Sequence, residues 1–373
     1  MTALLAETEV VARVFEHIDG GTTDLSAETW REPVANYLSP ERFQAELALM
    51  RRTPTPFCPS AMLPGPGSYL ARTAAGTPLV VIRGPDGVVR AFRNACRHRG
   101  AQVACGMGQQ KAFVCPYHGW TYGLDGALRG LPGEHGFPDL DKAAHGLIPV
   151  TAQEHGGLVY VTQAPAEGDG RDGVGSLPQL FGPTYELVSD VLRETQANWK
   201  VCAEGFLEGY HIYATHRDTF YPAQFDNLAV VEAFGANSRV TFPYRTIERL
   251  RGAPAETWST ESKLTYVYHL FPNVMIATLP KRILMVVLEP VHPGLTHYHR
   301  YTLARAEDLA ADRAAIEKGI AFGLEGERED RMIVESIQRS LASEANDAFT
   351  FGRFEGAITH FHKNLHAALG RLA

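Results

Sequence analysis

The sequence predicts an α+β protein built from two domains, and two observations lead to this prediction. Short apolar runs separated by turn residues fill residues 56–162, which is typical of a small antiparallel β domain. A second series of apolar runs, between residues 228 and 304, is followed by two helical patterns at about 307–342 and 351–372. We therefore expect the second domain to contain a twisted antiparallel sheet that grips a C-terminal helix.

The two domains divide the chain into four segments. Residues 1–50 show helical periodicity and are expected to form a lead-in that packs on the second domain. Residues 51–163 form the β-rich domain, and residues 164–183, rich in Gly, Asp and Pro, form the linker. Residues 184–373 form the second domain.

The composition excludes several functional classes. A net charge of −7 without a block of Lys or Arg argues against nucleic-acid binding. The chain has no apolar run of about 18 residues and its start lacks the features of a signal peptide, so no membrane segment is expected. Five cysteines, an odd number, fit metal ligation in a reducing cytoplasm better than disulfides.

A cluster of cysteines and histidines has the spacing of a metal site. Cys96 and His98 form a C-x-H pair, and Cys115 and His118 form a C-x-x-H pair on a second predicted turn. Two thiolates and two imidazoles suit either a tetrahedral zinc ion or a two-iron cluster. Each loop supplies one cysteine and one histidine, an alternation that favours the cluster. The remaining cysteines are expected to be small buried residues: Cys58, Cys105 and Cys202.

A second candidate site lies in the stretch Asn198 to His216, which reads as a buried helix. Glu208 and His211 are three residues apart, so on a helix they share a face, and the carboxylate can orient the imidazole. His216 lies five residues after His211, roughly 140° around a helix at 3.6 residues per turn. A regular helix cannot bring both imidazoles together, so the helix must end or bulge between them.

Two histidines need a third ligand, and the helical pattern near residue 330 supplies it. Asp330 shares the apolar face of that helix, whereas Glu335 falls toward the solvent. A carboxylate on an apolar face needs a partner, and a metal ion would supply one. Two histidines and one carboxylate with open positions form the facial triad of non-heme iron(II) oxygenases.

These motifs together identify a family. The sequences CRHRG and CPYHGWTYGLDG, the run NWK followed by E-x3-E-x-YH-x4-H, and ED-x4-E-x2-Q across Glu329 to Gln338 resemble the α subunit of Rieske non-heme iron oxygenases, the ring-hydroxylating dioxygenase group. The resemblance covers nearly the whole chain. It implies a β-rich Rieske [2Fe-2S] domain and a catalytic domain that holds a mononuclear Fe(II).

The resemblance assigns a role to each motif residue. It places Cys96, His98, Cys115 and His118 on the cluster. The mononuclear iron is expected to bind His211, His216 and Asp330.

The resemblance also implies how subunits cooperate. Glu208 takes the place of the family's carboxylate, usually Asp, that bridges His211 and a cluster histidine, here His118, of a neighbouring subunit. Gly205 stands where many members have Asn beside the iron. The family forms head-to-tail rings of three α subunits, with or without β subunits. Electrons come from NAD(P)H through a reductase, sometimes with a ferredoxin, and O2 is the oxidant.

Several functions fit these features. The leading expectation is hydroxylation of a small organic, aromatic substrate, as in aromatic hydrocarbon catabolism. The alternative is a monooxygenase or demethylase acting on an amine or methoxy substrate, because Glu at the bridge also resembles members that act on quaternary amines. A Rieske electron carrier, a ligand-binding protein without oxygenase chemistry and a zinc-stapled binding protein are the candidates from other classes.

Candidate walls of the substrate pocket are aromatic or polar residues near the histidine pair or on the strands that follow it. They are Phe206, Phe220, Tyr221, Phe225, Phe271 and Asn273. On the last helix, His362 and His366 are four residues apart, a spacing that can bind metal. We expect them instead to flank an apolar stripe on a half-exposed helix.

Overall fold

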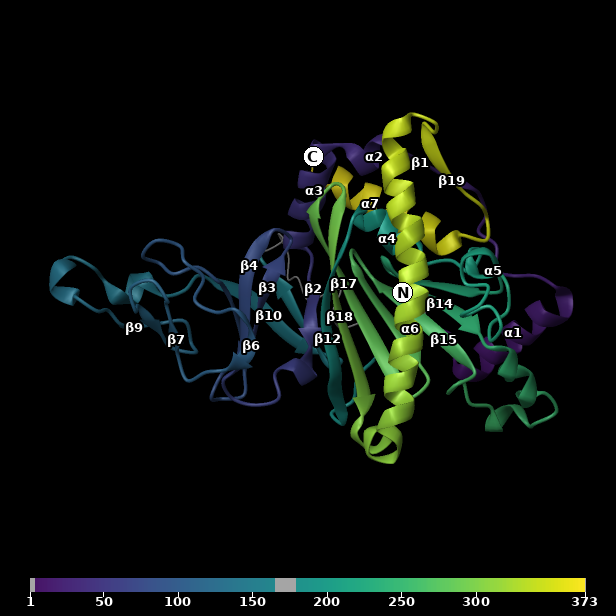
Figure 1. Ribbon diagram of the computed structural model, residues 1–373, viewed down its shortest axis with the longest axis horizontal. Coiled ribbons are helices and arrows are strands. Elements are labelled where there is room, and N and C mark those ends of the chain that lie inside the picture. Colours follow the sequence, from purple (N-terminus) through teal and green to yellow (C-terminus); the bar gives the residue numbers. More distant parts are fainter. Residues whose placement is uncertain (1–3, 165–178, 373) are drawn as a thin grey trace. The chain divides into compact units, whose positions relative to one another are not determined.

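The computed structural model describes residues 4–164 and 179–372 (Figure 1). Most of the predicted linker, residues 165–178, lies outside the described residues. The chain divides into two compact units, one formed by residues up to Leu49 together with those from Thr184 onward, and one formed by Met50–Pro183. Helices and sheets both contribute, which confirms the α+β fold class.

The unit Met50–Pro183 is built from a seven-stranded antiparallel sheet and a smaller three-stranded sheet. The large sheet has the order β2-β11-β10-β5-β4-β3-β6 and the small sheet β7-β8-β9. The strands are β2 Thr55–Pro59, β3 Ser68–Ala74, β4 Thr77–Arg83, β5 Val89–Arg93, β6 Gly106–Gln109, β7 Phe113–Val114, β8 Thr121–Tyr122, β9 Leu128–Gly130, β10 Pro149–His155 and β11 Leu158–Thr162. Three short 3-10 helices complete the unit: η1 Ser60–Met62, η2 Glu134–Gly136 and η3 Lys142–His145.

Glycine turns join the strands of this unit where the sequence predicts hairpins. Gly87, between β4 and β5, and Gly126, between β8 and β9, have φ values of 78° and 83°, which side chains rarely adopt. A Cβ on Gly126 would also lie 2.4 Å from the ring of Phe92. Only glycine therefore fits this turn, which connects two strands of the small sheet.

The other unit is organised around a seven-stranded antiparallel sheet with the order β12-β18-β17-β16-β15-β14-β13. The strands are β12 Tyr185–Thr195, β13 Val230–Phe234, β14 Asn237–Pro243, β15 Leu264–Leu270, β16 Val274–Leu279, β17 Arg282–His292 and β18 Leu295–Arg305. The central strands are rich in β-branched and aromatic residues and are almost wholly buried. Strand β12 was not expected from the sequence, because it is an edge strand whose residues are mostly half-exposed and polar.

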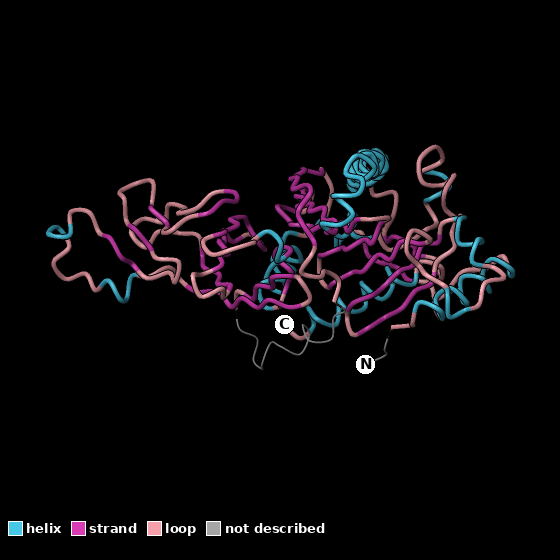
Figure 2. Tube along the Cα trace, turned by 90° about the horizontal axis from the view of Figure 1, so that it is seen from below, coloured by secondary structure: helices cyan, strands magenta, loops and turns pink. Residues whose placement is uncertain are grey.

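Two long helices follow the sheet, as predicted, but a strand separates them. Helix α6 spans Ala306–Ser340, with a kink at Asp312, and helix α7 spans Gly356–Gly370. Between them lie η6 (Leu341–Ser343) and strand β19 (Ala348–Phe351), so the last helix begins at Gly356 rather than at residue 351 as expected. Figure 2, in which α6 is seen end-on, places this helix on one side of the strands.

The C-terminal helix α7 packs through Phe361 against the seven-stranded sheet of the same unit. The Phe361 ring lies 5.1 Å from the His269 ring of β15 and 5.6 Å from the Trp199 ring. All three side chains are almost completely buried. The expected grip of the sheet on a C-terminal helix is thus observed for α7.

The N-terminal segment packs against the same unit. Helix α1 (Glu7–Gly20) buries Val10, Val11, Val14 and Phe15, and Asp24 accepts a hydrogen bond from the backbone of Val231 in β13. Further elements of this unit are β1 Trp30–Pro33, α2 Ala35–Leu38, α3 Pro40–Arg52, η4 Arg245–Leu250 and η5 Ala255–Thr257. Strand β1 pairs with β19, joining the two ends of the chain.

In the described part of the chain, no helix combines the length and the apolar character that a membrane crossing requires.

Candidate metal centres and substrate cavity

His211, His216 and Asp330 converge on one point. His211 and His216 flank the one-turn helix α5 (Ile212–Thr215), and Asp330 comes from α6. The Oδ1 atom of Asp330 lies 2.9 Å from Nε2 of His216 and 3.6 Å from Nε2 of His211. Together the three side chains offer ligand atoms within 4.8 Å of one another.

The stretch that holds the two histidines is not one helix, which corrects the sequence-based expectation. Helix α4 covers only Trp199–Glu204 and begins at Asn198, whose side chain accepts a hydrogen bond from the backbone of Lys200. The chain then turns through Gly205 to Tyr210 before α5 starts after His211. The main break therefore precedes His211, and the short helix itself ends at His216, where ψ reaches 34°.

A carboxylate outside the triad contacts the Nδ1 atom of each of its two histidines. Nδ1 of His211 lies 2.5 Å from Oε1 of Glu208, and Nδ1 of His216 lies 2.8 Å from Oε2 of Glu329. Burial alone would lower the pKa of His211, but the hydrogen bond and charge of Glu208 and the charge of Asp330 raise it above its ordinary value. A carboxylate on Nδ1 fixes the ring so that Nε2 presents its lone pair to a metal.

The residues present fit a mononuclear iron. Two imidazoles and one carboxylate are the ligands of a non-heme Fe(II) site. The imidazole of His216 is almost completely buried, with Nε2 directed to Asp330 and Nδ1 to a carboxylate, an arrangement expected for a ligand.

Sequence reasoning missed the position of Glu329. Its carboxylate also accepts a hydrogen bond from the Thr219 hydroxyl at 2.6 Å, so it is held from two sides. Adjacent residues of a helix point about 100° apart, and the helical-face argument that selects Asp330 therefore excludes Glu329. The only signal was their adjacency in the motif ED-x4-E-x2-Q.

Two cavities meet at the triad. One, of about 210 Å³, is lined in part by the carboxylates of Glu204, Glu208 and Glu355. Burial raises the pKa of Glu355 to about 7; the Gly352 N–H opposes this rise, and the charges of Glu208 and Glu204 add to it.

The second cavity, of about 190 Å³, is mainly apolar and contains both histidines. Its rings are Phe206, Phe220, Phe242, Tyr244 and Phe322. Gly205 lines both cavities, and a Cβ there would meet no atom closer than the Cys202 carbonyl oxygen at 4.0 Å. A side chain at this position would enter open space.

The six expected pocket residues divide into two groups. Phe206 and Phe220 line the apolar cavity, and the Phe220 ring lies 4.5 Å from that of His216. The other four line neither cavity. The ring of Tyr221 packs against that of Tyr213, the ring of Phe225 against the Arg245 guanidinium, and the ring of Phe271 lies near that of His269. Asn273 Nδ2 donates a hydrogen bond to the Leu288 carbonyl.

The second constellation is formed by two similar loops. The backbone N–H of Gly100 donates to the Cys96 carbonyl at 2.8 Å, and that of Gly119 donates to the Cys115 carbonyl at 3.0 Å. Both glycines have positive φ, 82° and 74°. Each loop thereby turns back sharply after its cysteine and directs its histidine toward the other loop.

The two loops bring their histidines together. Nδ1 of His98 and Nδ1 of His118 lie 3.0 Å apart, a spacing suited to two ligands on one metal at about 2.1 Å each. Cys96 and Cys115 are free and buried, whereas His118 is exposed. Two imidazoles at the surface and two thiols in the interior match a cluster with one iron on each pair.

Residues around the loops support both ligand pairs. The Tyr122 hydroxyl lies 3.2 Å from Sγ of Cys96 and accepts a hydrogen bond from the Arg97 backbone. Burial, and to a lesser degree Cys96, raises the pKa of Tyr122. Trp120 stacks on His98 at 5.1 Å. The expectation that Cys105 is buried was wrong, because its side chain is exposed.

Comparisons with known proteins agree with this arrangement. The family model of the ring hydroxylating alpha subunit (catalytic domain) matches residues 183–371, half of the chain, and that of the Rieske [2Fe-2S] domain matches residues 53–142. Chloroplastic choline monooxygenase of Beta vulgaris is 28% identical over 81% of this chain and 68% of its own length. The carnitine monooxygenase oxygenase subunit of Escherichia coli is 26% identical over 91% of this chain and 93% of its own length.

Solved structures show the same fold. The quaternary ammonium Rieske monooxygenase CntA with L-carnitine superposes with a TM-score of 0.77 at 22% identity, covering 99% of both chains. Naphthalene 1,2-dioxygenase from Rhodococcus sp. gives 0.76 at 18% identity, covering 98% of this chain and 99% of its own. The chain therefore belongs to the Rieske non-heme iron oxygenases, with a [2Fe-2S] Rieske domain followed by the mononuclear iron domain of a ring-hydroxylating α subunit.

Proposed function

We propose that this protein is the terminal oxygenase of a monooxygenase system that acts on a quaternary ammonium compound. The observation that carries the proposal is the similarity, over 81% to 91% of the chain, to proteins named choline and carnitine monooxygenases. A shorter match, 38% identical over 41% of the chain, is to a glycine betaine monooxygenase oxygenase subunit. These relatives favour the amine alternative over hydroxylation of an aromatic ring.

The apolar cavity supports this choice of substrate. Its aromatic walls include Phe206, Phe220 and Tyr244, and the faces of such rings attract a trimethylammonium group. Glu208, Glu327 and Asp330 contribute carboxylates to the same cavity, and Arg282 and Arg300 contribute guanidinium groups. A cation with a diffuse charge and methyl groups suits this combination better than a neutral hydrocarbon.

Arg300 favours substrates that also carry a carboxylate. Its Nε donates to Glu327 at 2.8 Å, but its Nη1 is buried and has no hydrogen-bond partner among the described residues. Arg300 also lines the apolar cavity, so its guanidinium group offers a positive charge to a substrate carboxylate there. Carnitine and glycine betaine carry such a group, whereas choline does not.

The metal ligands are assigned within this proposal. His211, His216 and Asp330 hold the mononuclear iron. The cluster is held by two pairs, Cys96 with Cys115 and His98 with His118. When bound, the metals supply O2 activation and carry electrons that originate in NAD(P)H and arrive through a reductase.

The chain's own residues orient these ligands and shape the site. Glu208 and Glu329 hold the two imidazoles so that each Nε2 faces Asp330. The aromatic walls exclude water from the reacting methyl group. One oxygen atom of O2 enters a C–H bond of the substrate, and the other leaves as water with two electrons and two protons.

The partners and setting follow from the same proposal. We propose a head-to-tail homotrimer in which Glu208 bridges His211 and the cluster histidine His118 of the next subunit. A ferredoxin or a β subunit would be additional components. The free cysteines of the described residues suit a reducing compartment such as the cytoplasm.

A substrate panel with a surrogate reductase tests the function. Carnitine, glycine betaine, choline and naphthalene are each incubated with NADH and O2, and product mass and NADH consumption are recorded. We expect oxygenated or demethylated products from at least one quaternary amine. A diol from naphthalene without turnover of any amine would overturn the proposal.

Two variants sharpen the test. Arg300→Met is expected to raise KM for carnitine or betaine at least tenfold, since it removes a charge-assisted pair, but to leave KM for choline unchanged. Glu208→Gln is expected to retain about three irons per chain yet to lose turnover. Normal turnover in Glu208→Gln would exclude the bridging role while leaving the substrate assignment intact.

A further inference from the structure

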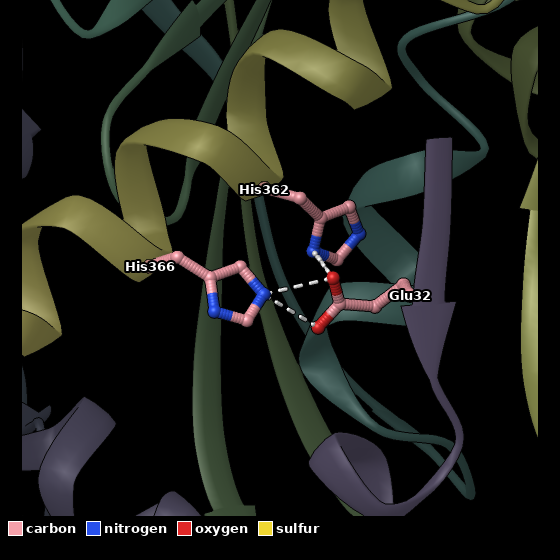
Figure 3. Close-up of side chains that lie close together, drawn as sticks. All are labelled: Glu32, His362 and His366. Carbon is pink, nitrogen blue, oxygen red and sulfur yellow. Dashed lines mark hydrogen bonds and ion pairs between the residues drawn. The ribbon is translucent and has the colours of Figure 1, made fainter. Parts of the chain in front are cut away.

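A second group of possible metal ligands lies outside both proposed metal centres. Glu32, on strand β1, meets His362 and His366, one turn apart on helix α7 (Figure 3). Nε2 of His366 lies 2.9 Å and 3.0 Å from the two carboxylate oxygens of Glu32, and Nδ1 of His362 lies 3.4 Å from Oε2. The three ligand atoms lie within 4.8 Å of one another.

His362 is held in a state that suits a ligand. In the tautomer that carries its proton on Nε2, this nitrogen donates a hydrogen bond to the carboxylate of Glu204 at 2.9 Å. Its Nδ1 then carries a lone pair, is fully buried, and makes no hydrogen bond with any described residue. With the proton on Nε2, this lone pair faces the Glu32 carboxylate at 3.4 Å, and a cation between the two groups, either a proton on Nδ1 or a metal ion, is required for electrostatic balance.

The Glu32 carboxylate is fixed in its orientation. It accepts hydrogen bonds from Nδ2 of Asn36 at 2.7 Å and from Nε1 of Trp30 at 3.0 Å, and it is fully buried. A buried carboxylate that is positioned by its neighbours is ready to bind a cation without reorganising.

The group has the same construction as the proposed iron triad in this chain. Both contain two histidines and one carboxylate. The distances from the histidine nitrogens to the carboxylate oxygen are 2.9 Å and 3.4 Å in the Glu32 group and 2.9 Å and 3.6 Å in the proposed iron triad. In both, a carboxylate outside the triad holds the remaining nitrogen of a histidine, Glu204 for His362 and Glu329 for His216. This is the usual outer support of a ligating imidazole.

We propose that Glu32, His362 and His366 form a third metal centre, which binds a divalent ion of the Zn²⁺ type. Two imidazoles and one carboxylate are preferred ligands of Zn²⁺. The His366 side chain is 36% exposed, which gives the ion access from solvent. The ion joins β1 to α7, two elements more than 300 positions apart in the sequence, and acts as a structural clamp. This inference does not depend on the identity of the substrate.

Metal analysis of the holoenzyme tests the proposal. Protein loaded with iron and its cluster is incubated with ZnCl2 and desalted, and zinc and iron are counted by mass spectrometry. We expect about one zinc per chain in addition to unchanged iron, and a rise of the unfolding temperature with zinc. His366→Gln, a partly exposed site that tolerates an amide, is expected to lose both the zinc and the rise.

A matched control separates this site from surface histidines. His297, with Nε2 3.3 Å from Glu194, is also a partly exposed histidine beside a carboxylate, but among the described residues it belongs to no group of three possible metal ligands. His297→Gln is expected to bind zinc as the wild type does. Zinc that displaces iron, that persists in His366→Gln, or that does not bind the wild type would overturn the proposal. In that case a protonated His362 between Glu32 and Glu204 accounts for the group without a metal.

Discussion

Replacing Glu329 by glutamine tests whether the carboxylate behind His216 prepares that imidazole to bind iron. The glutamine keeps the size of the side chain, and its amide oxygen can still accept from Nδ1 and from Thr219, but the negative charge is lost. The imidazole is then less basic and its orientation is less strongly fixed. We expect the variant to fold and to carry its Rieske cluster, but to hold the mononuclear iron more weakly.

The magnitude follows from the geometry. The His216 side chain is only 1% exposed and lies 2.8 Å from the carboxylate, so solvent screens the interaction little. Removal of such an outer partner typically weakens metal binding about 10- to 100-fold, which corresponds to about 1.4–2.8 kcal/mol. The upper end is not expected, because Glu329 keeps some contact with solvent.

The affinity for Fe(II) is measured by competition with a coloured chelator, and the visible absorbance of the cluster serves as the internal standard for folding. Glu325→Gln is the matched control, since it removes a carboxylate one turn earlier on α6 that pairs with Arg328 at the surface and contributes little. Equal iron affinity in wild type and Glu329→Gln would refute the reasoning. An equal loss of Fe(II) affinity in Glu329→Gln and Glu325→Gln would indicate an effect of the net charge of α6 rather than of the contact with His216.

Three further substitutions have expected outcomes. Tyr122→Phe removes the hydroxyl 3.2 Å from Sγ of Cys96, so the reduction potential of the cluster should fall in voltammetry; an unchanged potential would exclude this role. Gly205→Ala places a methyl group in open space at a helical φ of −63°. It should raise the free energy of unfolding by about 0.5 kcal/mol and, because the cavity becomes narrower, lower kcat/KM. A destabilised variant would contradict this expectation. Burial raises the pKa of Glu355 to about 7 from the ordinary 4.5, so the native state holds this proton more tightly than the unfolded chain and stability falls as pH rises from about 4.5 to about 7. Glu355→Gln should remove about 1 kcal/mol of that fall, less than the full pKa shift implies, because the carboxyl is only partly buried. Denaturant titrations at several pH values measure this. Parallel curves of stability against pH for wild type and variant would refute the assignment.

The cluster loops were predictable because their information is local. Cys96, His98, Cys115 and His118 lie in two short turns whose spacing alone indicates a metal site. The loop glycines that shape these turns stand in the same motifs. The sheet and α7 were also predictable, since β-branched runs and helical periodicity are local signals.

The neighbourhood of the mononuclear site was harder to predict. Hydrophobic periodicity suggested one helix from Asn198 to His216, but two glycines, Gly205 and Gly209, lie where the chain leaves helical geometry. Four of the six expected pocket residues also lie elsewhere. Closeness in sequence to a histidine says little about which face of a strand or turn a side chain occupies.

Long-range partners were beyond any local signal. The spacing of His362 and His366 is visible in the sequence, but Glu32 belongs to a strand near the other end of the chain. Only the pairing of β1 with β19 brings this carboxylate to α7. A contact of this kind depends on the whole topology rather than on a motif.

The carboxylates that contact the two histidines of the proposed iron site also contribute to the charge of that site. Asp330, Glu208 and Glu329 bring three negative charges to within one side chain of the iron position, whereas Fe(II) brings two positive charges. The loaded centre thus carries an excess of about one negative charge. A permanently cationic substrate is drawn toward such a centre and lowers its field on arrival. Under the proposed ligand assignment, a neutral ring gains nothing from this charge, and the net preference also depends on the guanidinium groups of Arg282 and Arg300 that line the same cavity.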